Sequence, residues 1–532
     1  MKKLINKASI KFAIGLTVIL SVATSCRKDM AGLNQDNMSV PRSILAIDGN
    51  EASVLLPGMI TNIISPVHWQ YQLQQNLGQD IYSGYMMTPT PFIGNVNNVT
   101  YALVDGWVNY IWDIPQGNVL NTWLQWKLLG YDKKYPDLYG ISLICKAWAA
   151  SRAADAFGPI PYSKFGESTS VPFDTVQEEY YAFFDDLDQA IAGLSKVEDV
   201  TPLADQTRFS KVDKSGFGGD YANWIKAANT LKLRLAIRIS NIDPAKAKTE
   251  AESAVANKYG LLDATTPAFS VVPPDSNPLF TISNAWGDIR IGAPFSSILG
   301  GYKDPRLAAL AAPATDPVAN GQIIGIRQGV PISDKGTYEG FSMLINTVTS
   351  PIKIMGKAES YFLRAEGVLR GWNMGGGSAQ TFYEQGIQTS FTETGANGAA
   401  AYIADATSTP AAYVDPKNPA NNASPLSSVT IQWNDADNFN TKLERVITQK
   451  WIAGFPEGCE AWAEFRRTGY PKLYPVIVNN SQGAIPPGKF IKRFTYTTSF
   501  TNASKAQVDA AVTKNFGGSD SPYKSLWWDI NP

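Results

Sequence analysis

The feature that most constrains the fold is a series of amphipathic helical segments that occur in consecutive pairs. Hydrophobic residues recur at helical spacing in each segment, so that Tyr180, Phe184 and Leu187, for example, share one face. The pairs comprise residues 138–157 with 175–194, 221–240 with 244–257, 357–372 with 379–391, and 438–454 with 457–468. Because each apolar face has to be buried against another helix, the sequence predicts a mostly α-helical protein.

Small residues at the contact positions of these pairs predict stacked repeats of the tetratricopeptide kind, in which each pair packs on the next. Long insertions rich in Gly, Pro and Asn separate the pairs, which explains why no strict period is seen. We expect the insertions to form a second, irregular lobe with short strands and a binding face. The predicted helical scaffold covers about 51–258, 351–394 and 436–470, and the loop-rich lobe about 78–98, 259–350, 395–435 and 471–532.

The N-terminus has the three parts of an export signal. Four lysines precede an uncharged apolar run from Phe12 to Val22, and small residues follow at 23–25. The run is closer to half than to all of the ~20 residues that a membrane-spanning helix needs, so we interpret residues 1–25 as a cleaved signal peptide rather than an anchor. Cys26 stands where a lipoprotein signal places its lipidated cysteine, and residues 26–50 are expected to form the tether.

The three residues after Cys26 bear on the destination of the protein. Arg27, Lys28 and Asp29 resemble the lysine and acidic signal that sends some lipoproteins to the outer face of the outer membrane. The alternative is a charged start to the linker. We favour export to the cell surface.

Composition and motifs exclude several kinds of chemistry. A net charge of −1 and 17% charged residues give no basic face for nucleic acid. The single histidine, His68, excludes sites that need two histidines, and its apolar neighbours favour a packing or surface role. The chain has no phosphate-binding loop, and Gly375–Gly377 is interpreted as a linker. We expect neither a catalytic site nor a cofactor, whereas a paired-carboxylate glycosidase site and an irregular calcium site stay open.

The cysteines and aromatic residues leave further alternatives. Cys145 and Cys459 lie in apolar helical segments, where two buried thiols are favoured over a disulfide. The chain holds 14 Trp, 23 Tyr and 23 Phe, many beside Asn and Gln, as in 68–75 and 107–126. Aromatic faces beside amides suit uncharged polar ligands such as sugars, although most of these rings are expected in the core.

A set of short motifs resembles one family in order along nearly the whole chain. The motifs are FGPIPY at 157–162, WIKAANTLKLRLAIR at 224–238, DPRL at 304–307, YFLRAEG at 361–367, QKWIA at 449–453, EAWAEFRRTGYP at 460–471, RFTY at 493–496 with Asn502, and WWD at 527–529. Together they resemble the SusD/RagB-like nutrient-binding outer-membrane lipoproteins. The resemblance implies a single unit over 51–532, an outer-membrane lipid anchor, and a SusC-type TonB-dependent transporter on whose outer opening the protein forms a lid.

The resemblance places the motifs in the scaffold and the ligand surface in loops. We expect Arg467 and Glu366 to form buried contacts, Trp462 to fill core, and Glu460 and Glu464 not to be catalytic. In the loops 78–98 and 276–300, the expected ligand-binding residues are the stacking platform Trp286, then Asp288 and Arg290 as hydrogen-bonding groups, with Tyr82, Tyr85, Phe92 and Asn98 as second choices. The alternative is that Trp286 only packs its own lobe.

These observations predict a glycan- or oligosaccharide-binding lipoprotein that passes its ligand to the transporter without bond cleavage. Three alternatives stay open at this point: uptake of peptides by the same route, a surface glycoside hydrolase, and a structural lid with negligible affinity of its own.

Overall fold

The computed structural model describes residues 49–200 and 209–531. The predicted signal peptide, the lipidation at Cys26, residues 27–29 and nearly all of the tether lie outside these ranges and stay predictions. No helix in the described ranges is both long enough and apolar enough to cross a membrane.

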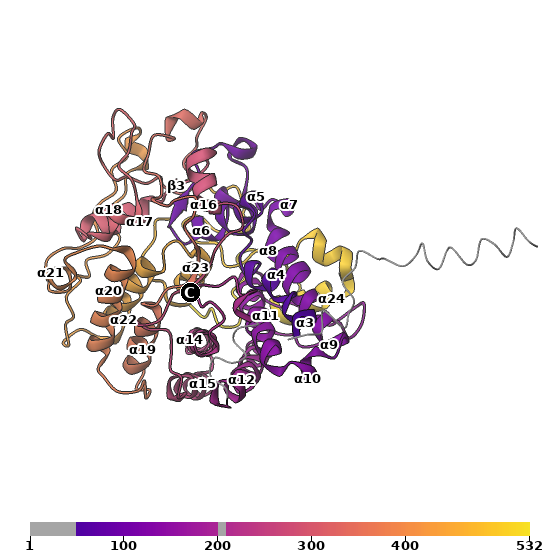
Figure 1. The fold of residues 1–532 in the computed structure, drawn as a ribbon. Helices are drawn as coiled ribbons and strands as arrows, with labels where there is room; N and C mark the ends of the chain where they lie inside the picture. Colours follow the sequence, from indigo (N-terminus) through magenta and orange to yellow (C-terminus); the bar gives the residue numbers. More distant parts are fainter. Residues whose placement is uncertain (1–48, 201–208, 532) are drawn as a thin grey trace, which may run out of the picture. The chain divides into compact units, whose positions relative to one another are not determined.

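The four predicted helix pairs are present, and the mostly α-helical fold is confirmed. The pairs are α11 (Pro136–Phe157) with α12 (Val176–Val200), α14 (Tyr221–Arg238) with α15 (Pro244–Ala256), α19 (Glu359–Leu369) with α20 (Ala379–Thr394), and α22 (Phe439–Gly454) with α23 (Gly458–Thr468). The two helices of each pair contact each other, and successive pairs meet where α12 packs on α14, α14 on α19, and α19 on α22 (Figure 1). This arrangement is consistent with tetratricopeptide-like stacking.

Local sequence signals set the ends of these helices. The side chain of Asp220 accepts a hydrogen bond from the backbone of Asn223 at the start of α14, and Asp243 does the same for Lys246 before Pro244 in the first turn of α15. Gly469 ends α23 in the left-handed conformation that glycine tolerates best. Within α11 every residue from Asp137 to Phe157 is buried, so this helix lies at the centre of the scaffold.

Further helices, most of them short, lie in the N-terminal part and in the second lobe. Helices before α11 are α3 (Asn50–Ser53), α4 (Leu56–Thr61), α5 (His68–Tyr71), η2 (Gln72–Asn76), α6 (Gln79–Tyr82), η3 (Phe92–Asn95), η4 (Asn98–Thr100), α7 (Asp105–Val108), α8 (Tyr110–Ile114), η5 (Pro115–Leu120), α9 (Asn121–Leu128) and α10 (Tyr131–Lys134). Later ones are α16 (Pro278–Phe280), η6 (Thr281–Ala285), α17 (Ala293–Gly301), α18 (Arg306–Leu310), η7 (Lys335–Thr337), α21 (Ala399–Ile403), η8 (Pro419–Asn421) and α24 (Thr498–Phe516).

The predicted short strands form two antiparallel pairs. Strand β1 (Met86–Met87) pairs with β3 (Arg290–Ile291), and Met86 lies opposite Ile291. Strand β2 (Phe269–Val271) pairs with β4 (Ile352–Met355), and Val271 lies opposite Ile352. The first pair therefore joins the segment around residue 86 to the segment that follows Trp286.

Two segments differ from their predicted form. Residues 78–89 do not form a surface loop, because their apolar and aromatic side chains are buried in α6, β1 and the turns beside them. The tail contains α24, a long helix that the sequence pattern did not reveal. Its helical spacing is interrupted at Ser504, whose backbone is extended, and only one face is buried. Cys145 and Cys459 are both free and buried.

Candidate functional site

Exposed aromatic side chains gather where α5, η6 and α8 approach one another. Trp286, at the end of η6, is 37% exposed and meets the ring of His68 edge to face, with ring centroids 6.1 Å apart. Trp69 is 45% exposed and meets Tyr110 edge to face at 5.2 Å. We call Trp286, His68, Trp69 and Tyr110 the aromatic surface. Figure 1 shows α5 and α16, which η6 continues, close together near β3.

Asp288 is part of a polar cluster that holds the loop carrying Trp286. Its carboxylate accepts hydrogen bonds from Thr90 Oγ1 at 2.6 Å, Lys335 Nζ at 3.1 Å and Gln72 Nε2 at 3.3 Å. Lys335 Nζ also donates to the backbone oxygen of Trp286 at 2.5 Å. The half-buried carboxylate therefore joins three neighbouring segments.

His68 is anchored beside Trp286. Its Nε2 atom lies 2.7 Å from the hydroxyl of Ser276, which precedes α16. The Ser276 hydroxyl also contacts the hydroxyl of Thr281 at 3.1 Å, and among the described residues no carboxylate is hydrogen-bonded to His68 to complete a Ser-His-Asp triad. Its observable role is to buttress the edge of the Trp286 ring.

Arg290 supports this loop from inside. Its side chain is 3% exposed, and it donates to the backbone oxygens of Glu339 at 2.7 Å, Ser283 at 3.1 Å and Ile289 at 2.6 Å. Burial lowers the pKa of this guanidinium, and the charges of Glu339 and Asp288 oppose that shift. In this arrangement Arg290 positions the segment 283–291, and its donors are directed at the protein.

The second group of candidate residues is mostly enclosed. Tyr82, Tyr85 and Asn98 are at most 3% exposed. The Tyr82 hydroxyl donates to the backbone oxygen of Asn98 at 2.7 Å, and the Tyr85 hydroxyl donates to that of Trp451. Phe92 is half-buried and meets Trp107 edge to face at 5.8 Å. Of these candidates, only Phe92 has accessible surface for a ligand.

The structure brings Trp286 and Asp288 together with residues that the sequence reasoning did not select. His68, Trp69, Tyr110 and Lys335 belong to the surroundings of Trp286. The runs 68–75 and 107–126 carried a signal for His68, Trp69 and Tyr110, because both combine aromatic rings with amides. Lys335 carried none, since it lies in a polar turn 49 residues after Trp286.

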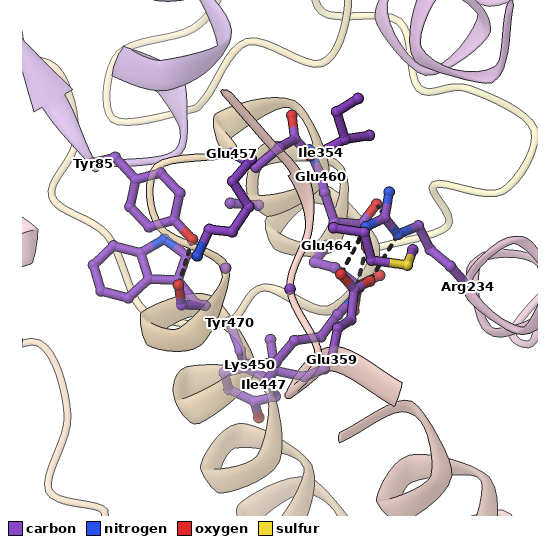
Figure 2. A pocket seen from close by; sticks show the side chains of 16 residues that line it. Tyr85, Arg234, Ile354, Glu359, Ile447, Lys450, Glu457, Glu460, Glu464 and Tyr470 are labelled. Carbon is purple, nitrogen blue, oxygen red and sulfur yellow. Dashed lines mark hydrogen bonds and ion pairs between the residues drawn. The ribbon is translucent and has the colours of Figure 1, made fainter. Parts of the chain in front are cut away.

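Charged residues of the helical scaffold form a buried ionic network. Arg234 donates two hydrogen bonds of 2.7 Å to Glu359, and Lys450 Nζ lies 2.6 Å from Glu460. Figure 2 shows these side chains converging with Glu464 around a narrow pocket. Burial alone would raise the pKa of Glu464. The charges of Arg467, Lys450 and Arg238 outweigh this effect and hold that pKa well below its usual range.

This network accounts for glutamates that could otherwise suggest a catalytic pair. Arg238 donates to both Glu460 and Glu464, and Arg467 joins Glu464 to Glu366 at 2.8 and 2.7 Å. Each carboxylate is thus engaged by fixed cations and enclosed by α14, α19, α22 and α23. Within residues 49–200 and 209–531, no group of three or more His, Cys, Asp or Glu is placed to hold a metal ion.

Comparison with protein families gives one match. The SusD-like family model, described as SusD and RagB outer membrane lipoprotein, matches residues 32–529. No curated protein sequence is matched.

Several solved structures are similar over nearly their whole length. A chitin-binding SusD homolog from Flavobacterium johnsoniae is 45% identical, with a TM-score of 0.86, and the alignment covers 91% of this chain and 99% of that one. A SusD homolog from Bacteroides vulgatus is 35% identical, with a TM-score of 0.85 and coverage of 91% and 99%. A SusD-like protein from Bacteroides thetaiotaomicron is 34% identical, with a TM-score of 0.84 and coverage of 90% and 99%.

Proposed function

The chain belongs to the SusD-like family of outer membrane lipoproteins, and we propose that it captures an oligosaccharide at the cell surface and delivers it to a SusC-type TonB-dependent transporter. The observation that carries the proposal is the aromatic surface around Trp286. Two exposed tryptophans from different segments, each braced edge-on by a second ring, present apolar faces of the kind on which sugar rings stack.

The polar cluster around Asp288 also supports oligosaccharide binding. Asp288 and Lys335 fix the backbone and place charged groups beside the ring, where they can exchange hydrogen bonds with hydroxyl groups. A similar structure from Flavobacterium johnsoniae is described as chitin-binding, so chitin oligosaccharides are the first ligands to test. We expect binding here to proceed without bond cleavage, and the buried glutamates of the scaffold are engaged in ion pairs.

Delivery requires the protein to be held beside its partner. We propose that lipidated Cys26 and the tether 26–50 keep it at the outer membrane, and that Arg27, Lys28 and Asp29 direct it to the outer face. Alanine substitutions at residues 27–29 should leave lipidation intact while reducing protease accessibility on whole cells.

Calorimetry with purified protein tests the ligand class. The wild type should bind chitin oligosaccharides, and Trp286→Ala should weaken binding by about tenfold or more. Trp372→Phe, at a buried ring in the scaffold, is the control and should bind as the wild type does. Binding of peptides but of no glycan would replace the oligosaccharide assignment by peptide uptake. New reducing ends after incubation would identify a hydrolase, and unchanged cellular uptake by Trp286→Ala would indicate a purely structural lid.

A further inference from the structure

A second cavity lies apart from the aromatic surface. It has a volume of about 590 Å³ and is bounded by β4, the C-terminal end of α20, the segment 344–351 and the segment that follows α22. None of the four residues of the aromatic surface lines it, nor does Asp288. The volume is within the range of small-molecule sites, about 300 to 1,000 Å³.

Lys353 on β4 lines this cavity and also the narrow pocket of Figure 2. Its ammonium group donates one hydrogen bond of 3.0 Å, to the backbone oxygen of Ala453, and makes no ion pair within the described part of the chain. Lys450, by contrast, lies within 3.6 Å of three carboxylates. A partly buried ammonium with three donors and a single carbonyl partner is one that an anion would stabilise.

The surrounding charges do not supply that anion. Desolvation lowers the pKa of Lys353, and the more distant charges of Glu393, Glu359 and Glu457 only oppose the shift. Glu393, the carboxylate that lines the cavity, accepts from the backbone nitrogens of Lys357 at 2.8 Å and Ala358 at 3.2 Å. Its oxygens therefore cap the start of α19. Lys357 adds a second cation to the cavity wall, which leaves the wall with an excess of positive charge.

The lining also presents polar groups that suit hydroxyls, and one of them, Ser270, lies beside Lys353 in the β2–β4 pair. Asn346 donates to the side chain of Asn277 at 3.3 Å, and its own Oδ1 atom is buried without a hydrogen-bond partner in the described structure. An unsatisfied buried carbonyl of this kind costs free energy unless a donor reaches it. Ser270 and Thr392 contribute further hydroxyl groups to the lining.

We propose that this cavity binds a small hydroxylated carboxylate, a sugar acid, whose carboxylate pairs with Lys353 while a hydroxyl donates to Asn346. The lining of the cavity indicates a ligand with an anionic group and a hydroxyl group. The choice of a sugar acid among such ligands rests on the proposed glycan function. The site shares no lining residue with the aromatic surface at Trp286, so the two sites can be altered separately.

The test compares D-glucuronate, D-glucose and propionate by calorimetry on the full mature protein. D-Glucuronate should bind at least about tenfold more tightly than either D-glucose, which lacks the carboxylate, or propionate, which lacks the hydroxyls. Lys353→Met should abolish that preference, and Lys353→Arg should retain it. Met replaces the ammonium by an apolar group of similar length, so the variant is expected to fold.

Matched controls separate this site from the proposed function. Lys489→Met removes an exposed lysine outside the cavity and should leave D-glucuronate binding unchanged, as should Trp286→Ala. If the wild type binds D-glucuronate no better than D-glucose, or if Lys353→Met binds it as tightly as the wild type does, the proposal is wrong. Failure to bind chitin oligosaccharides with retained D-glucuronate binding would reject the stacking site alone.

Discussion

Arg467 on α23 donates two hydrogen bonds of 2.7 Å to the carboxylate of Glu366 on α19, 101 residues earlier in the chain. Both side chains are at most 1% exposed, and a second edge of the Arg467 guanidinium donates from Nε and Nη2 to Glu464. This pair ties the last helix pair to the third one in the interior of the scaffold. Planar, bidentate geometry of this kind is specific to arginine.

We therefore expect Arg467→Ala to be strongly destabilising. The substitution leaves the carboxylate of Glu366 buried without that partner, which costs about 3 to 5 kcal/mol in comparable buried pairs. Urea unfolding followed by circular dichroism measures the loss. Lys505→Ala, in the exposed pair with Asp509, is the control and should leave the transition nearly unchanged. If the two substitutions lowered the free energy of unfolding equally, the buried pair would not be the stabilising contact that we infer.

The helical scaffold could be predicted because residues close together in the sequence determine where its helices form and end. Residues such as Tyr180, Phe184 and Leu187 repeat at helical spacing, and all three are buried on the predicted face of α12. Asp243 and Pro244 likewise mark the start of α15 in the sequence and in the structure. Helix α24 escaped prediction because the extended backbone at Ser504 interrupts its periodicity.

The site was less predictable because exposure depends on contacts between distant segments. Trp286 and Tyr85 look equally suitable in sequence, yet one is exposed and the other is enclosed by Trp451, Phe295 and Phe455. The hydrogen bonds from Lys335 to Trp286 and Asp288 join residues 49 and 47 positions apart in the sequence. No short-range sequence pattern predicts such contacts.

Lys335 is predicted to position Trp286. Lys335→Met removes its hydrogen bonds to the Trp286 backbone and to Asp288, so the ring loses its fixed orientation and glycan affinity should fall about three- to tenfold. Because Lys335 is partly exposed, the melting temperature should change little. Calorimetry and thermal unfolding measure the two quantities, with Lys505→Met as the control. Unaltered affinity would show that Trp286 is held by other contacts.

The two buried cysteines are predicted to be unreactive in the folded protein. Burial raises the pKa of Cys145 well above its usual value and that of Cys459 to about 12. Because the thiolate is the reactive form, a thiol reagent such as DTNB should label neither residue at pH 8 until urea unfolds the chain. The measurement uses protein in which Cys26 is replaced by serine. Rapid labelling of the folded protein would show that one of these helices opens.

Asp80 is predicted to make stability fall as pH rises from about 4 to about 7. The pKa of this carboxyl is raised to about 7, and burial is the largest cause. Hydrogen bonds from Gln75 and Asn76 partly offset the effect of burial. The charge of Glu457 raises the pKa further, and that of Arg152 lowers it. At a pH between the pKa of Asp80 in the unfolded chain and its higher pKa in the folded protein, the folded state holds a proton that the unfolded state has lost. The stabilisation is therefore complete only below the unfolded pKa, and it is lost as the pH rises to the folded pKa.

Asp80→Asn tests this linkage. The neutral amide keeps the shape of the protonated acid, and Asn76, whose Oδ1 has no hydrogen-bond partner in the described structure, can rotate to accept from it. Urea unfolding at pH 5 and pH 7.5 should show the wild type losing more stability than the variant over this interval. Asp509→Asn, at an exposed carboxylate, should follow the wild type. Parallel pH dependence of wild type and Asp80→Asn would mean that Asp80 titrates near its unfolded pKa and is stabilised as a charged group by Arg152.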